Sequence, residues 1–174
     1  MKNEPTQSRL SIKRLAAVCG LYCGACSLYI ATTENPERLG RLATQFKLSE
    51  ESIKCYGCRS DKRFPPCDKC IMSTCAAEKK IDFCSECSKY PCEDLKKFHS
   101  AMPHRIELWD DLQFIKNAGY EQWLKKIPLH YACSHCQTIN SAYDLKCRKC
   151  GNDPSCDYVC KHKIAIERHL SNAR

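Results

Sequence analysis

Apolar residues recur at helical spacing in several parts of the chain. In residues 36–46 the apolar positions are Leu39, Leu42, Ala43 and Phe46. A repeat of three and four residues is typical of one helix face. Asn35 is suited to cap such a helix, and Pro36 suits its first turn. The pattern therefore predicts a helix over 36–46.

A longer apolar pattern lies between residues 103 and 128. Its first part has apolar side chains at Ile106, Trp109, Leu112, Phe114 and Ile115, and its second part has them at Tyr120, Trp123, Leu124 and Ile127. Asn117 and Gly119 end the first part, and Pro128 follows the second. We predict two consecutive helices, with their aromatic residues in a core rather than in a ligand site.

One further helix is predicted over residues 154–172, with Pro154 in the first turn and Val159, Ile166 and Leu170 as apolar positions. No run in the first 130 residues alternates cleanly between apolar and polar residues. That part of the chain is therefore predicted to be mostly helical.

Cysteine content changes this picture, because 17 of the 174 residues are cysteine. The N-terminal stretch contains no apolar run of signal-peptide length, and no later stretch approaches the roughly 18 apolar residues that span a bilayer. We therefore expect a cytoplasmic protein without membrane contact, in which reduced cysteines serve as metal ligands. With 5 Phe and 2 Trp, the chain is expected to form a thin core that needs metal sites for stability.

The strongest metal motif consists of two Cys-x-x-Cys turns separated by ten residues: Cys133, Cys136, Cys147 and Cys150. Two such turns that face each other provide four thiolates for a tetrahedral zinc ion. Gly151 suits the positive φ that is often needed after the second turn, whereas Gln137 replaces the glycine often found after the first. We predict a zinc ribbon, in which the intervening residues form a tight β-hairpin.

Two further groups of four cysteines occur upstream. The first repeats the double turn with eight residues between the pairs and consists of Cys55, Cys58, Cys67 and Cys70. The second consists of Cys75, Cys84, Cys87 and Cys92. Both groups are predicted metal sites, and exchange of ligands between them is left open.

Three cysteines remain near the N-terminus: Cys19, Cys23 and Cys26. Three thiolates at this spacing can bind three irons of a four-iron, four-sulfur cluster, whose fourth iron takes another ligand or stays open. Radical S-adenosylmethionine enzymes share the spacing, but they build a large αβ barrel for which this chain lacks the length and the strands. The alternative is a zinc site completed by Cys92 or a histidine. The sequence does not distinguish iron from zinc here.

Cys156 and Cys160 lie four residues apart on the predicted C-terminal helix, and therefore on one helix face. They could form a second small metal site with His162 or His169. The alternative is that both thiols pack against the ribbon and both histidines are exposed.

The motifs between residues 19 and 124 resemble the cysteine-rich domain-of-unknown-function family thirty-seven ninety-five. The resemblance rests on CGLYCGACSLYIAT, CYGC, CDKCIMSTCAAEKKIDFCSECSKYPCEDL and AGYEQWL, in that order. It implies a cytoplasmic domain that binds zinc or iron–sulfur through the eleven cysteines of residues 19–92, with no assigned reaction. Residues 131–174 lie outside it and resemble a generic zinc ribbon.

These observations divide the chain into three predicted parts. Residues 1–18 are an N-terminal segment, and residues 19–128 are a small, irregular, metal-stapled domain that is mostly α-helical with cysteine knuckles. Residues 129–174 are the zinc-ribbon β-hairpin with a C-terminal helix. The forty residues without cysteine between the two cysteine clusters mark the boundary.

The formal net charge of +8 raises the question of nucleic-acid binding. A divalent ion held by four thiolates carries a net charge of −2, so three such sites would reduce +8 to about +2. The basic residues nearest the ribbon are Lys146, Arg148, Lys149, Lys161, Lys163 and Arg168, with Tyr131 and Tyr143 available for base stacking. We favour a solvated basic face around an anionic metal site over a nucleic-acid surface.

The predicted function is a metal-binding, cytoplasmic binding or adaptor module with a protein partner, because closed four-thiolate sites leave no coordination position for a substrate. The alternative is an iron–sulfur redox or cluster-carrying protein of anaerobic metabolism, which would use Cys19, Cys23 and Cys26 as ligands. No metalloprotease, phosphate-binding or Ser-His motif is present, so catalysis is not favoured. The oligomeric state is not predicted.

Overall fold

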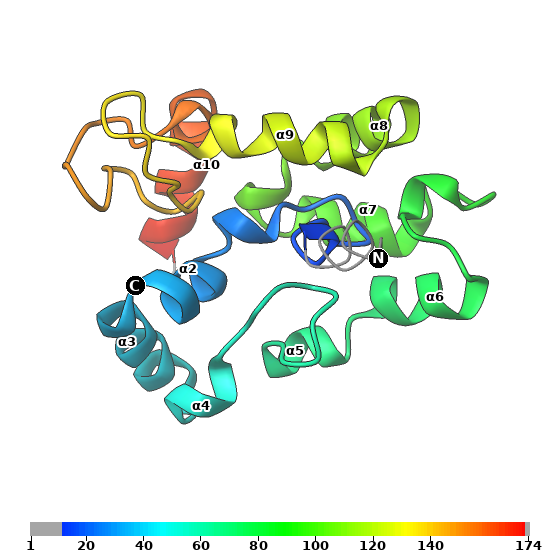
Figure 1. The fold of residues 1–174 in the computed structure, drawn as a ribbon, viewed down its shortest axis with the longest axis horizontal. Helices are drawn as coiled ribbons and strands as arrows, with labels where there is room; N and C mark the ends of the chain where they lie inside the picture. The colour runs from blue at the N-terminus through cyan, green and yellow to red at the C-terminus, as the bar shows by residue number, and fades with distance from the viewer. Residues whose placement is uncertain (1–11, 173–174) are drawn as a thin grey trace, which may run out of the picture.

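The computed structural model describes residues 12–172, which form helices joined by irregular segments (Figure 1). In chain order the elements are η1 (Cys23–Ala25), α2 (Ser27–Glu34), α3 (Pro36–Phe46), α4 (Glu50–Ile53), α5 (Pro65–Asp68), α6 (Ile71–Lys79), η2 (Cys84–Glu86), α7 (Glu93–Ser100), η3 (Pro103–Arg105), α8 (Leu108–Ala118), α9 (Tyr120–Tyr131) and α10 (Asp157–Asn172). Helices α8 and α9 lie along one side of the molecule and α3 to α6 along the other, with α2 and α7 between them. None of the helices in the described part is long and apolar enough to cross a membrane.

The predicted helix over 36–46 is confirmed as α3. Its N-terminus forms where expected, because the side-chain oxygen of Asn35 accepts a hydrogen bond from the Arg38 N–H at 2.9 Å. It ends at Lys47, whose φ of 55° is left-handed. Leu39 and Ala43 are buried in a small apolar cluster with residues of α2 and α4.

The two helices predicted between residues 103 and 128 are also confirmed. Gly119, with a φ of 83°, makes the break between α8 and α9. The second helix continues past Pro128 to Tyr131, one turn beyond the prediction. Trp123 is 2% exposed, and its indole N–H donates a 2.7 Å hydrogen bond to Asp111 of α8, so this aromatic residue belongs to the core.

A continuous apolar core joins the N-terminal turn, α8, α9 and α10. It includes Ala16 near the N-terminus, Leu112 of α8, Ile127 of α9 and Ile166 of α10. The C-terminal helix begins at Asp157 rather than at residue 154, and Val159 and Ile166 face this core. The interior is therefore more extensive than the thin core expected from composition, while the domain boundaries at 18/19 and 128/129 stay a prediction.

The predicted β-hairpin of the zinc ribbon is wrong. The described residues contain no β-strand, and pairing within residues 129–156 is confined to an isolated bridge between Ala132 and Ile139. Side chains take the backbone groups that a hairpin ladder would use: the Asp144 carboxylate accepts from the Ser141 N–H at 2.9 Å, and the Asn140 side-chain oxygen accepts from the Arg148 N–H at 3.0 Å. A cysteine cluster is present without a strand on either side of it.

Candidate metal centre

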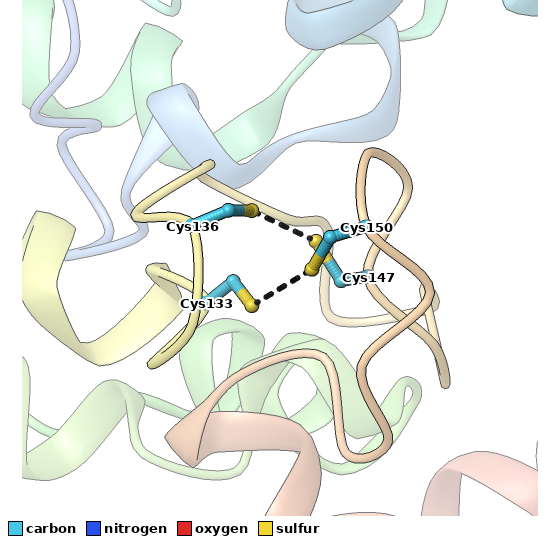
Figure 2. Close-up of side chains that lie close together, drawn as sticks. All are labelled: Cys133, Cys136, Cys147 and Cys150. Carbon is cyan, nitrogen blue, oxygen red and sulfur yellow. Dashed lines mark hydrogen bonds between the residues drawn. The ribbon is translucent and has the colours of Figure 1, made fainter.

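Four cysteine sulfurs converge in the segment between α9 and α10 (Figure 2). The sulfurs of Cys133, Cys136, Cys147 and Cys150 all lie within 4.8 Å of one another. Cys133 Sγ lies 3.6 Å from Cys150 Sγ, and Cys136 Sγ lies 3.6 Å from Cys147 Sγ. Zinc–sulfur bonds of about 2.3 Å give a tetrahedron with edges of roughly 3.8 Å. The spacing of the sulfurs therefore fits a single ion bound by all four.

Each pair of cysteines lies in a turn with the same backbone hydrogen bonds. In the first turn the Gln137 N–H donates to the Cys133 carbonyl, and in the second the Gly151 N–H donates to the Cys147 carbonyl, both at 2.9 Å. The residue after each turn is left-handed, with φ of 59° at Gln137 and 77° at Gly151. The two turns thus adopt one geometry, although only the second has the glycine that this backbone favours.

A buried asparagine connects the two turns. Asn140 is 0% exposed, and its side-chain N–H₂ donates to the Thr138 carbonyl at 2.9 Å and to the Ser155 carbonyl at 3.2 Å. The same N–H₂ lies 3.7 Å from Cys147 Sγ, and its oxygen accepts from the Arg148 N–H. One side chain therefore ties the first turn to the second and to the approach to α10.

Hydrogen bonds favour the thiolate form at part of the site. Burial raises the pKa of the Cys147 thiol, but N–H groups of Cys150 and Lys149 outweigh this effect and lower the pKa to about 6. A hydrogen bond with Thr138, at 3.3 Å, lowers the pKa of Cys136. The Asn152 N–H lowers the pKa of Cys150, but burial and the hydrogen bonds with the other thiols outweigh it and raise the pKa to about 12.

The N-terminal cysteines are not grouped in space as their spacing in the sequence predicts. Among the described residues, the sulfurs of Cys19, Cys23 and Cys26 do not all lie within 4.8 Å of one another. The Cys58 N–H donates to Cys23 Sγ at 3.3 Å, and burial, with Cys58 and Cys26 nearby, raises the pKa of Cys23. Cys19 is buried, and burial is the main reason that its pKa is raised. The first motif is thus interleaved with the group that contains Cys55.

In the described residues, the Cys133 group is the sole set of three or more histidine, cysteine or acidic side chains whose ligand atoms all lie within 4.8 Å of one another. The structure therefore does not bring together the predicted groups Cys19, Cys23 and Cys26, or Cys55, Cys58, Cys67 and Cys70, at that spacing. Their roles as ligands stay a prediction. The third group, Cys75, Cys84, Cys87 and Cys92, lines one small cavity.

Cys156 and Cys160 do not converge with a histidine at that spacing either. Cys156 is buried and Cys160 is exposed. The His162 ring forms a 2.8 Å hydrogen bond with Glu107, and the His169 ring lies 5.6 Å from the ring of Tyr143. Both histidines therefore have other contacts, and the small site predicted here also stays a prediction.

Asn140 and Lys79 are among the residues that contact thiols and that were not predicted from the sequence. Asn140 contacts the Cys133 group, and Lys79 donates a 3.3 Å hydrogen bond to Cys87 Sγ. A small polar residue between two cysteine turns is a signal that could have singled out Asn140. Lys79 is the last residue of α6, and it contacts Cys87 only because the fold brings the two residues together. The sequence around Lys79 therefore gives no comparable signal.

Comparison with known proteins supports the N-terminal part of this description. A family model described as protein of unknown function (DUF3795) matches residues 15–97. Searches of curated proteins and of solved structures returned no match. The matched residues include the eleven N-terminal cysteines, whereas the AGYEQWL motif and the Cys133 group lie beyond them. Residues 15–97, a little under half of the chain, therefore match the family of unknown function that the sequence motifs resemble.

Proposed function

We propose that this protein is a zinc-dependent binding module in which Cys133, Cys136, Cys147 and Cys150 hold a structural zinc ion. The observation that carries this proposal is the 3.6 Å spacing between sulfurs, close to the edge of a zinc–thiolate tetrahedron. A four-iron cluster places four metal atoms between its cysteine sulfurs and needs them farther apart. The spacing therefore supports a single ion.

The position of the site supports a structural role. The first turn begins directly after α9, at Cys133, and the second turn leads through Ser155 into α10. This linking segment has no strand, so its backbone is held by the two turns, by Asn140 and by the ion. With four thiolates bound, zinc has no open position for a substrate, which favours stabilisation over catalysis.

The surroundings of the basic residues favour a protein partner over nucleic acid. Arg148 pairs with Glu34, Lys161 with Asp157 at 2.9 Å, and Lys163 with Asp153 at 3.2 Å. Of the two tyrosines considered for base stacking, Tyr131 is 6% exposed. The hydroxyl of Tyr143 is hydrogen-bonded to His104. Several groups that would contact phosphates or bases are thus already engaged within the chain.

The test is the metal content of the full chain purified without oxygen. Elemental analysis, an assay for acid-labile sulfide and visible absorption would be measured on the same preparation. Zinc without sulfide or visible colour is the expected result for the thiolate sites. Iron with an equal amount of sulfide, and no zinc, would contradict the proposal and favour the iron–sulfur alternative.

A further inference from the structure

A second set of thiols surrounds a cavity between α6 and α7. The cavity has a volume of about 40 Å³ and is lined by Cys75, Cys84, Cys87 and Cys92. These residues come from separate elements: Cys75 lies on α6, Cys84 begins η2, Cys87 follows η2, and Cys92 caps α7. The fold therefore brings four thiols to one small space from a stretch of 18 residues.

The polar contacts of this cavity are directed at sulfur. Lys79 lies at the end of α6, and its ammonium donates a hydrogen bond to Cys87 Sγ at 3.3 Å. The backbone N–H of Lys89 donates to Cys87 Sγ at 3.4 Å. Much of the remaining lining is apolar, with Met72 and Leu95 both buried. N–H donors on sulfur stabilise the thiolate form, which is the form that binds metal.

We propose that Cys75, Cys84, Cys87 and Cys92 bind a single thiophilic divalent cation such as zinc, with Lys79 donating a hydrogen bond to the Cys87 thiolate. A divalent ion with four thiolates carries a net charge of −2, and the Lys79 ammonium offsets part of it. No three of these sulfurs all lie within 4.8 Å of one another, so binding of an ion would draw the sulfurs inward. The site uses none of the residues of the Cys133 group and does not depend on it.

The size of the cavity argues for one ion rather than a cluster. A dry cavity of about 150 Å³ accommodates benzene, which has six heavy atoms. A cavity of about 40 Å³ is roughly a quarter of that size, whereas a four-iron, four-sulfur cluster has eight atoms. The volume between these thiols therefore suits a single ion, and the sulfurs would move closer together around it.

Cobalt(II) titration of the full, metal-free chain tests this proposal, because tetrahedral cobalt bound to thiolates absorbs in the visible range. The Cys84→Ser/Cys87→Ser variant should bind one equivalent less than the wild type. Lys79→Met should bind the full number, with one equivalent weakened by about 10- to 100-fold. Lys116→Met is the matched control, since Lys116 is also an exposed lysine in the last turn of a helix, and it should leave every equivalent unchanged.

The outcomes separate this site from the Cys133 group. A Cys133→Ser/Cys136→Ser variant should lose a different equivalent and keep the one that is sensitive to Lys79. Equal cobalt binding by the wild type and Cys84→Ser/Cys87→Ser would overturn the site. An unchanged affinity in Lys79→Met would overturn the role of the lysine, and this exposed substitution stays informative even if the double cysteine variant does not fold.

Discussion

Replacing Asn140 by alanine tests whether one buried side chain holds the two cysteine turns together. The substitution removes hydrogen bonds with the Thr138 carbonyl, the Ser155 carbonyl and the Arg148 N–H, at 2.9 to 3.2 Å. Each net contribution is about 1 kcal/mol, so the loss is about 3 kcal/mol. For a chain of this size, about 1 kcal/mol corresponds to 2–4 °C, and the midpoint of thermal unfolding should fall by about 6–12 °C.

The assay is thermal unfolding followed by circular dichroism at a fixed excess of zinc, because bound metal shifts the midpoint by mass action. The Asn117→Ala variant is the control, since Asn117 is exposed and its side-chain oxygen accepts one bond, from Gln113 at 3.0 Å. This control should unfold within about 2 °C of the wild type. A midpoint for Asn140→Ala equal to that of the control would refute the reasoning.

Three further outcomes are expected. Gly151→Ala should lower the unfolding midpoint by about 2–4 °C, because a Cβ meets no atom within 4 Å there and the strain of the positive φ costs about 1 kcal/mol; an unchanged midpoint would count against that strain. Burial opposes ionisation of Glu107, but the rings of His130 and His162, with nitrogens 2.7 and 2.8 Å from its carboxylate oxygens, lower its pKa to about 2. Burial likewise opposes protonation of His130, but Glu107 outweighs it and raises the pKa of His130. The stabilisation from Glu107 is therefore complete above its unfolded pKa of about 4.3, and it is lost as the pH falls through about 2. The stabilisation from His130 is complete below its unfolded pKa of about 6.5, and it is lost as the pH rises through the raised pKa of the folded state. The difference in unfolding midpoint between the wild type and Glu107→Gln should thus be largest near pH 5–6 and smaller at pH 9, and a difference that grew with pH would contradict this sign. Random single- and double-stranded oligonucleotides should not bind the protein with an affinity that depends on salt. A binding constant whose logarithm falls linearly with the logarithm of salt concentration, with a slope equivalent to several phosphate contacts, would favour a nucleic-acid partner instead.

Local patterns were sufficient to predict α3, α8, α9 and most of α10, together with the cluster of four cysteines. The capping oxygen of Asn35 and the break at Gly119 depend on residues within four positions of each other, so their effects are visible in the sequence. The same is true of each Cys-x-x-Cys turn, because its backbone hydrogen bonds close within five residues. Features fixed by neighbours in the chain were therefore predictable.

Features fixed by distant contacts were not predictable in the same way. The hairpin expected between the turns did not form, because Asn140 and Asp144 bind backbone groups through their side chains. The interleaving of Cys23 with Cys58 joins residues 35 positions apart and depends on how the N-terminal turn meets the following loop. Sequence spacing identifies cysteine pairs, while the grouping of pairs into sites is decided by the fold.

The most direct test of the central claim compares the zinc content of the full chain with that of a Cys133→Ser/Cys136→Ser variant, both purified without oxygen. Removing two of four thiolates leaves too few ligands for a closed structural site. We expect the variant to contain one zinc ion fewer per chain than the wild type. Equal zinc content in the two preparations would contradict the assignment of these four cysteines as a metal centre.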